Sequence, residues 1–473
     1  MSKNRYKTLL SNTLLISVGT FGSKILVFFM VRFYTGYLTP SDYGTADLIT
    51  QTANLLFPLI SLGITDGVFR FALDSIKDRQ SIFSTGLYTI TLGALMFLFI
   101  VPLFGFVKEF ESFIWLIVVY TMASCYHSLC VQFIRATGNT MLFAVQGIIN
   151  TSLVIGLNIL FLAVFNLGIT GYVLSVVLAD FICTVYLFVR ERLWRQIILH
   201  PKKSAAVSML KYSIPLIPTT VIWWITSVSD RYMVNGYIGS EANGIYAVSY
   251  KIPTILTLVS SIFMQAWQFS AVAESHGDRK EHIKFFSRVW RSFQAIMFLA
   301  GALIIAFSKP VIKILSTENY YEAWKYVPLL SASMIFTAFV SFTGTVYVVT
   351  KKSGVSLVTA IVGAISNIVL NYFLIPSKLG VQGAAIATFI SYFAVFIIRA
   401  FNTKKYIPFE LHGFYVALNT VILMVQILFM ICQWKGWQMV QAVCILLIVA
   451  VNFKFLMLCL NKIFSTFLKR KED

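Results

Sequence analysis

The chain has 473 residues, of which 58% are hydrophobic and only 12% are charged, and its mean hydropathy is +0.79. Soluble globular proteins carry about a quarter charged residues, so this composition excludes an ordinary soluble enzyme. The net charge of +19 does not indicate nucleic-acid binding, because the basic residues lie in short loops between apolar segments. A nucleic-acid footprint would gather them on one solvated face.

Apolar stretches long enough to cross a membrane as helices, at about 20 residues per crossing, occur fourteen times along the chain. The alternation over about ten residues that marks a membrane β-barrel is absent from the sequence. We therefore predict an all-α polytopic membrane protein with about 14 transmembrane helices. The stretches lie at residues 10–34, 44–69, 82–106, 112–134, 141–165, 169–189, 212–235, 244–271, 287–307, 326–349, 354–375, 381–401, 411–432 and 437–460.

Basic residues are divided unevenly between the two sides of the predicted membrane. With this order of spans, 27 of the 38 lysines and arginines lie on the side of the two termini and 8 on the opposite side, while Lys24, Lys251 and Lys454 lie inside spans. Loops rich in lysine and arginine stay in the cytoplasm. Both termini are therefore expected to be cytoplasmic.

Two short sequence echoes indicate an internal repeat. The segment Gly36-Tyr-Leu-Thr-Pro-Ser-Asp-Tyr-Gly44 follows the first span, and Gly236-Tyr-Ile-Gly-Ser-Glu-Ala-Asn-Gly244 follows the seventh. Likewise Leu167-Gly-Ile-Thr-Gly171 precedes the sixth span, and Leu379-Gly-Val-Gln-Gly383 precedes the twelfth. The echoes predict two parallel six-helix lobes, residues 1–200 and 201–405, followed by helices 13 and 14 with a cytoplasmic tail at 406–473.

Three charged residues lie deep inside predicted spans, where a charge is costly and usually faces a bundle interior or a water-filled cavity. Lys24, Lys251 and Asp180 lie about 8 to 11 residues from the outer ends of their spans, or roughly 12–16 Å deep at 1.5 Å per residue. The two lysines suit a cavity that binds an anion. Asp180 either neutralises one of them or couples transport to a proton or cation.

Other polar residues of the spans have structural alternatives. Asp230 and Arg231 end the seventh span near the outer surface, where they form either a gate latch or an interfacial cap. His127 is expected to be a satisfied polar core residue and not a proton relay, since no second histidine supports it. Asp66 and Arg70, four residues apart, resemble a helical ion pair.

No motif for catalysis or metal binding is present in the sequence. A P-loop, HExxH, GxSxG and an aspartate-rich metal cluster are all missing, and the six cysteines show no CxxC spacing. The sequence therefore predicts a transporter and not an enzyme, with no catalytic residue, metal or cofactor. Asparagines inside spans are expected to form hydrogen bonds between helices, with binding of sugar hydroxyls as the alternative: Asn150, Asn158, Asn367 and Asn371.

A family resemblance rests on several of these segments. They are Leu38-Thr-Pro-Ser-Asp-Tyr-Gly44, Arg135-Ala-Thr-Gly138, Ile214-Pro-Leu-Ile-Pro218, Asp230-Arg231 and Gly244-Ile-Tyr-Ala-Val-Ser-Tyr-Lys251. Together they resemble the polysaccharide-biosynthesis flippases of the multidrug/oligosaccharidyl-lipid/polysaccharide (MOP) exporter superfamily, including those that move O-antigen or capsule repeat units. The resemblance implies two lobes around a cavity that opens alternately to either side of the cytoplasmic (inner) membrane.

The substrate that the resemblance implies is an undecaprenyl-pyrophosphate-linked oligosaccharide, moved from the inner to the outer leaflet for surface polysaccharide assembly. The cationic cavity of the family maps onto Lys24 and Lys251, with Arg32 and Arg231 near the outer mouth, and Asp180 and Asp230 are candidates for coupling or gating. Drug exporters of the superfamily often carry a carboxylate in the first span, where this chain has Lys24 and no acid. That departure favours an anionic substrate.

Two other functions remain open: a flippase for another polyprenyl-linked cell-wall precursor, and a cation-coupled multidrug exporter that depends on Asp180. A proton, a sodium ion or the membrane potential, worth about 2.3 kcal/mol per charge per 100 mV, would drive the cycle. Expected partners are the lipid-linked oligosaccharide, membrane lipids, and a polysaccharide polymerase with glycosyltransferases. Nucleic acid is not expected.

Overall fold

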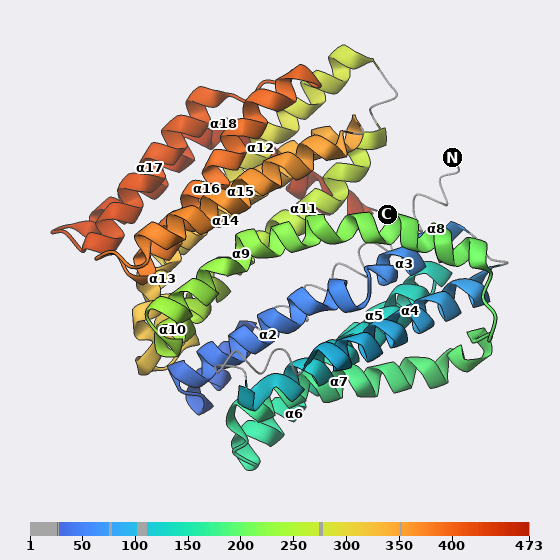
Figure 1. Cartoon of the computed structure of the whole chain (residues 1–473). Coiled ribbons are helices and arrows are strands. Elements are labelled where there is room, and N and C mark those ends of the chain that lie inside the picture. The colour runs from blue at the N-terminus through green and yellow to red at the C-terminus, as the bar shows by residue number, and fades with distance from the viewer. Residues whose placement is uncertain are drawn as a thin grey trace. The chain divides into compact units, whose positions relative to one another are not determined.

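The computed structural model describes the backbone of residues 26, 28–74, 78–101, 111–273, 278–350 and 352–472. All regular secondary structure in these residues is helical, and they contain no strand (Figure 1). The chain divides into two compact units, Met1–Val228 and Ser229–Asp473. The predicted all-α fold is confirmed.

The first unit is built from helices that pack around α5 and α7. Residues 28–37 are helical and lead into α2. A π-helix, η3, continues α6. The elements are α2 (Pro40–Ile60), α3 (Ile64–Asp74), α4 (Arg79–Ile100), η2 (Glu111–Phe113), α5 (Ile114–Thr137), α6 (Thr140–Asn158), η3 (Ile159–Val164), α7 (Gly168–Arg190), η4 (Leu193–Gln196), α8 (Lys203–Ser213) and η5 (Ile214–Leu216).

The second unit has α14 at its centre, packed against α11, α12 and α16, while α17 and α18 pack on each other and on α12 (Figure 1). Helix α9 (Ile217–Tyr237) runs from the first unit into the second. The remaining elements are α10 (Ser240–Lys251), α11 (Thr254–Ala273), α12 (Arg279–Ala306), α13 (Ser308–Leu315), η7 (Glu318–Lys325), α14 (Val327–Val349), α15 (Ser353–Leu374), α16 (Val381–Asn402), η8 (Thr403–Lys405), α17 (Gly413–Cys432) and α18 (Trp437–Glu472).

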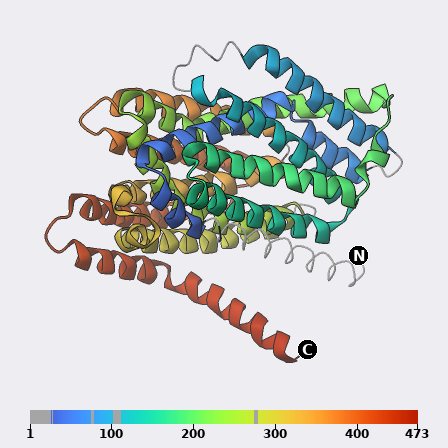
Figure 2. The ribbon, with the colours of Figure 1, turned by 90° about the horizontal axis from the view of Figure 1, so that it is seen from below.

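The described helices account for thirteen of the predicted spans. Eleven helices, one of them running through α8 and α9, are long and apolar enough to cross a membrane alone, and two more spans result if each of two bent helix pairs counts as one. Of the first predicted span, 10–34, only residues 26 and 28–34 are described, and these are helical. The last helix is the longest of them: α18 has 36 residues and α17 has 20, so α18 runs on past its partner (Figure 2).

Two of the predicted spans are broken into pairs of helices, and at the second of them the sequence had indicated an interruption at Pro253. Helices α2 and α3 meet at 54°, and α10 and α11 meet at 42°. At the first break, Leu62 and Gly63 both have positive φ, at 49° and 60°. At the second, Pro253 follows Ile252 between the helices, and a proline removes a backbone donor and restricts the residue before it. A broken span exposes backbone carbonyls that a straight helix would use internally.

The sequence echoes occupy matching turns in the two units. One helix ends at Tyr37 and the next begins at Pro40, while α9 ends at Tyr237 and α10 begins at Ser240. In the second echo, Gly168 and Gly380 share a left-handed φ of 52°, which glycine adopts without steric cost.

The second glycine of each echo lets two consecutive helices approach closely. A Cβ on Gly171 would lie 3.0 Å from the Cβ of Phe161, and a Cβ on Gly383 would lie 2.5 Å from the carbonyl oxygen of Leu374. Both contacts are closer than real Cβ atoms comfortably allow. The repeated Leu-Gly-x-x-Gly pattern therefore has a steric cause. The boundaries proposed from it, at residues 200 and 405, stay predictions.

The core of the second unit is aromatic. Trp290 lies against Phe339 and Phe342, with ring centroids 4.9 and 5.1 Å apart, and Phe342 stacks on Trp267 at 4.8 Å. The indole N–H of Trp290 donates to the carbonyl oxygen of Leu411 at 2.8 Å. This bond holds the segment before α17 against α12.

Candidate functional site

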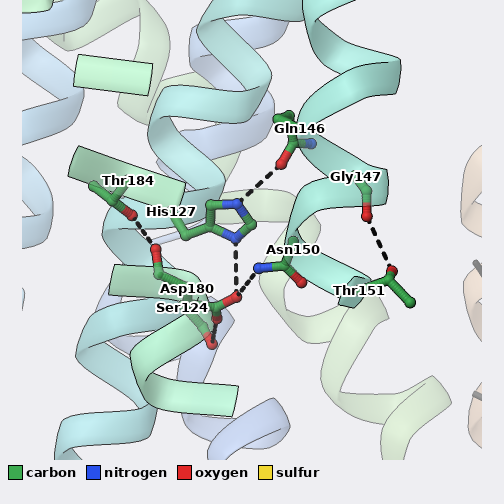
Figure 3. A network of polar contacts seen from close by, with 8 residues as sticks. All are labelled: Ser124, His127, Gln146, Gly147, Asn150, Thr151, Asp180 and Thr184. Carbon is green, nitrogen blue, oxygen red and sulfur yellow. Dashed lines mark hydrogen bonds and ion pairs between the residues drawn. The ribbon is translucent and has the colours of Figure 1, made fainter. Parts of the chain in front are cut away.

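A cluster of hydrogen-bonded side chains surrounds Asp180 in the first unit (Figure 3). Asp180 lies on α7 and is 7% exposed. The hydroxyl of Ser124 donates to its Oδ2 at 2.7 Å, and the amide of Asn150 donates to its Oδ1 at 2.9 Å. Nδ1 of His127 lies 3.1 Å from the same Oδ1. The cluster thus joins α5, α6 and α7 through one carboxylate.

The histidine of this cluster is held from both sides. While Nδ1 faces Asp180, Nε2 lies 3.2 Å from Oε1 of Gln146 on α6. A neutral imidazole carries one N–H and one acceptor nitrogen, yet both nitrogens of His127 face oxygen atoms. Turning the Gln146 amide so that its NH₂ group faces Nε2 satisfies a neutral ring that donates from Nδ1 to Asp180. His127 is thus bonded on both sides and links α5 to α6 and α7.

The contacts of Asp180 include two hydrogen-bond donors, from Ser124 and Asn150. In the described part of the chain, no group of three or more His, Cys, Asp and Glu residues is placed to hold a metal.

The sequence interpretation of His127 and Asp180 was incomplete. Among the ion pairs of the described residues, Asp180 contacts His127 and not a lysine. His127 was expected to be a satisfied polar core residue, and its ring has polar partners on both sides. One partner is a carboxylate 53 positions along the chain, on a helix that does not follow its own. Helical spacing gave no signal for that pairing.

Asp230 lies at the centre of a second polar cluster, in the second unit. It is fully buried within α9, and its Oδ2 accepts the hydroxyls of Tyr246 at 2.8 Å, Tyr250 at 2.6 Å and Thr388 at 3.1 Å. Its Oδ1 accepts the backbone N–H of Arg231 at 2.9 Å. The prediction of an interfacial cap was therefore wrong, because Asp230 joins α9, α10 and α16 from inside. Its gating role stays a prediction.

Two of the asparagines predicted to link helices, Asn150 and Asn367, do so. Asn150 binds Asp180, and Asn367 on α15 accepts the Ser229 hydroxyl at 2.9 Å and donates to Thr388 at 3.3 Å. Asn158 differs, since its side-chain amide donates to the carbonyl of Val154 in its own helix.

The basic residues predicted to bind substrate lie in different settings. Lys251 is half-buried and is the last residue of α10, at the break before α11. Arg231 is half-buried on α9 and its guanidinium carbon lies 4.5 Å from the ring centroid of Tyr250. Arg32 is exposed. Lys24 lies outside the described residues.

One further expectation about charge is corrected. Arg70 pairs with Asp74 at 3.5 Å and not with Asp66, because both spacings suit a helix and the carboxylate toward the helix end lies within reach. Arg399, in the last turn of α16, is buried. Its guanidinium donates to the carbonyl oxygen of Val340, to the hydroxyl of Thr359 and to Ser356, and so ties α16 to α14 and α15.

Solved structures share this fold at low sequence identity. The structure titled "Lipid II flippase MurJ, inward closed conformation" matches with a TM-score of 0.71 and 15% identity, covering 95% of this chain and 100% of that one. An outward-facing multidrug resistance MATE family transporter of the MOP superfamily matches at 0.60 and 14%, covering 85% and 96%. A MOP superfamily transporter from Pyrococcus furiosus matches at 0.58 and 13%, covering 83% and 95%. No curated protein sequence matches the chain.

The fold is therefore that of the multi-pass membrane transporters of the MOP superfamily. Within it, a family profile described as "Polysaccharide biosynthesis protein" matches residues 29–325. The chain belongs to this family of polysaccharide biosynthesis proteins, and the resemblance found in the sequence is confirmed.

Proposed function

We propose that the protein is a flippase that moves polyprenyl-pyrophosphate-linked oligosaccharide units from the inner to the outer leaflet of the cytoplasmic membrane, for surface polysaccharide assembly. The observation that carries the proposal is membership of the polysaccharide biosynthesis family over residues 29–325. The MOP transporter fold supports it. Both termini lie in the cytoplasm in this proposal, as the distribution of lysine and arginine predicts.

The physical task is to carry a charged, sugar-bearing headgroup across about 30 Å of hydrocarbon while the polyprenyl tail stays in lipid. Basic residues inside the membrane lower the cost of burying the pyrophosphate. Lys24 and Lys251 keep this role in the proposal, with Arg231 and Arg32 as further contacts. Lys251 lies at the C-terminus of α10, where the helix dipole favours a cation.

The Asp180 cluster supplies the driving step in this proposal. The proposal places proton uptake and release on His127 and Asp180, which are in contact between α5 and α7. A change in their protonation would alter the hydrogen bond that joins the two helices.

A second candidate function is a proton-coupled exporter of small molecules. The observation in its favour is the same cluster, together with a fold shared with multidrug resistance MATE transporters. It differs from the first in its substrate, since an exported cation would gain nothing from basic residues such as Lys251. A flippase for another polyprenyl-linked cell-wall precursor would use the same basic residues and the same proton site.

Deletion of the gene tests the proposal. Polyprenyl-linked sugars and surface polysaccharide are compared in the parent strain, the deletion strain, and strains complemented with the wild-type protein or with Lys251→Ala. We expect complete lipid-linked units to accumulate in the deletion strain while the surface polymer disappears. Lys251→Ala should restore little polymer, and the charge-preserving Lys251→Arg should restore more.

The outcomes separate the candidates. Unchanged polysaccharide with retention of cationic dyes in the deletion strain would indicate the small-molecule exporter. Accumulation of a different polyprenyl-linked precursor would indicate the other type of flippase. Full rescue by Lys251→Ala would exclude Lys251 from the proposed binding site. The lipid that accumulates in the deletion strain would still identify the substrate.

A further inference from the structure

A groove of about 830 Å³ lies in the second unit between α16 and α17. Its floor is aromatic, with Phe396 and Phe409 from the core below. Its rims include Phe401 on α16 and Val421 on α17, which are 68% and 59% exposed. In a membrane-spanning chain, such rims face the lipid. The groove is therefore open to the hydrocarbon of the bilayer along its length.

The length of the groove corresponds to one leaflet. On α16 and the short helix η8 that follows it, the lining residues run in a helical stripe from Phe393 to Lys404, eleven residues apart, which is about 16 Å at 1.5 Å per residue. On α17 the stripe runs from Gly413 to Val421. Half of the hydrocarbon core is about 15 Å thick. An acyl chain of a single leaflet fits this length, and a polyprenyl tail is longer than the groove.

One end of the groove is polar. Lys404, His412 and Glu410 line it there, while the other lining residues are apolar apart from Thr420. Oε2 of Glu410 lies 3.8 Å from Nε2 of His412, and the Glu410 side chain is 76% exposed to solvent. Polar groups therefore gather only where α16 ends and the segment before α17 begins, at the level of lipid headgroups.

The net charge at this end of the groove is positive. Lys404 lines the groove, and the buried guanidinium of Arg291 stacks on the Tyr415 ring at 3.7 Å on the other side of α17. Arg291 lies close enough to lower the pKa of His412, after the larger effect of burial and against the opposing effect of Glu410. The two cations Lys404 and Arg291 thus outnumber the one exposed carboxylate, Glu410. A negatively charged headgroup is attracted to this end.

We propose that the α16–α17 groove binds an anionic phospholipid of the surrounding leaflet, with one acyl chain in the groove and its phosphate at Lys404 and His412. Each part of the lipid has its counterpart in the groove: the apolar length, the open rim and the cationic end. The site is distinct from the proposed headgroup and proton sites. It depends on the chain being embedded in a membrane and not on which substrate the protein moves.

Binding is tested on the purified full-length protein in detergent, by native mass spectrometry with phosphatidylglycerol and phosphatidylethanolamine of identical acyl chains. We expect phosphatidylglycerol to be retained more strongly. Lys404→Ala should weaken its retention about fivefold, as expected for one basic contact to an anionic lipid. Lys435→Ala, an exposed lysine between α17 and α18, is the matched control and should leave retention unchanged.

A second variant tests the groove and not its charge. Ala417 lines the groove and is exposed, so Ala417→Phe fills the space without entering the core and should abolish retention of both lipids. Ala442→Phe on α18, also exposed and outside the groove, is its control. Equal retention of the two lipids by the wild type, or wild-type retention by Ala417→Phe, would overturn the proposal. Displacement of phosphatidylglycerol by a polyprenyl phosphate would overturn it in favour of the substrate tail.

Discussion

Nδ1 of His127 on α5 lies 3.1 Å from Oδ1 of Asp180 on α7. Nε2 of the same ring lies 3.2 Å from Oε1 of Gln146, so the histidine is held between α6 and α7. In the proposed function a proton moves through this contact. Ser124 and Asn150 donate to the carboxylate and hold it in place.

Asp180→Asn tests the role of this proton. The amide keeps the size of the side chain but cannot exchange a proton with His127, so transport should fall about 5- to 100-fold, as for a lost coupling free energy of about 1–3 kcal/mol. The dependence of transport on external pH should also become weaker. The readout is restoration of surface polysaccharide in the deletion strain at several pH values. Asp74→Asn, in an exposed pair with Arg70, is the control, and equal activity of both variants would exclude proton coupling here.

Asp230→Ala should destabilise the second unit strongly. The change leaves the hydroxyls of Tyr246, Tyr250 and Thr388 without their acceptor, and each buried polar group left unpaired costs about 1–3 kcal/mol. The melting temperature in detergent is expected to fall sharply. Tyr250→Phe removes one donor and leaves the acceptor paired, so it should cost about 1 kcal/mol. If both variants melt like the wild type, this cluster does not stabilise the helix packing.

Gly383→Ala should disrupt the contact between α15 and α16. The new Cβ would lie 2.5 Å from the carbonyl oxygen of Leu374, a backbone atom that moves only with its helix. Gly156→Ala in α6 meets no atom within 4 Å and should be neutral or stabilising by up to about 1 kcal/mol, because alanine favours the helix. Thermal unfolding of the two variants in one detergent makes the comparison. Equal melting temperatures would contradict the steric explanation of the glycine echo.

Arg399→Lys should destabilise the protein although it keeps the charge. The planar guanidinium donates to Thr359, Val340 and Ser356 at once, and a lysine ammonium lacks that fork geometry. We expect a loss of about 2 kcal/mol or more, since charged donors form the stronger hydrogen bonds. The exposed Arg70→Lys serves as control. A melting temperature equal to that of the control would show that the three bonds are dispensable.

His412 predicts a direction for the effect of pH on stability. Burial, reinforced by the charge of Arg291, lowers the pKa of His412 below its ordinary value of 6.5. The folded state therefore favours the neutral ring: this contribution is complete above pH 6.5 and is lost as the pH falls through the lowered pKa. His412→Asn removes the titration and suits the left-handed φ of 47° at this position. Melting curves from pH 7.5 to 5 should fall less steeply for this variant than for the wild type.

Hydropathy was sufficient to predict the helical fold and the positions of thirteen spans, because a spanning helix must satisfy its own backbone in lipid. It did not reveal the break after Ile60, whereas Pro253 in the sequence had indicated the break after Lys251. These arise from a few residues with unusual backbone geometry inside apolar sequence. The repeat was predictable because glycine pairs such as Gly380 and Gly383 are required by sterics wherever the same hairpin forms.

The polar sites were only partly predictable, for a different reason. The cost of a charge in lipid marks Asp180 as important, but the sequence does not say which helix faces it. The His127 contact depends on the rotation of α5 against α7, and the burial of Asp230 depends on tyrosines from α10. Such pairings are set by packing across helices and leave no periodic trace in the sequence.

The matching hairpins at Gly168 and Gly380 lead into helices that carry different buried side chains at the same position. Twelve residues beyond the first glycine stands Asp180 with its hydrogen-bond partners, and twelve beyond the second stands Tyr392, a buried side chain. One backbone design thus occurs twice in the chain with the carboxylate in a single copy. The molecule carries its own internal reference: a property that depends on the hairpin should respond alike to changes in either copy, and a property that depends on the carboxylate should respond to one alone.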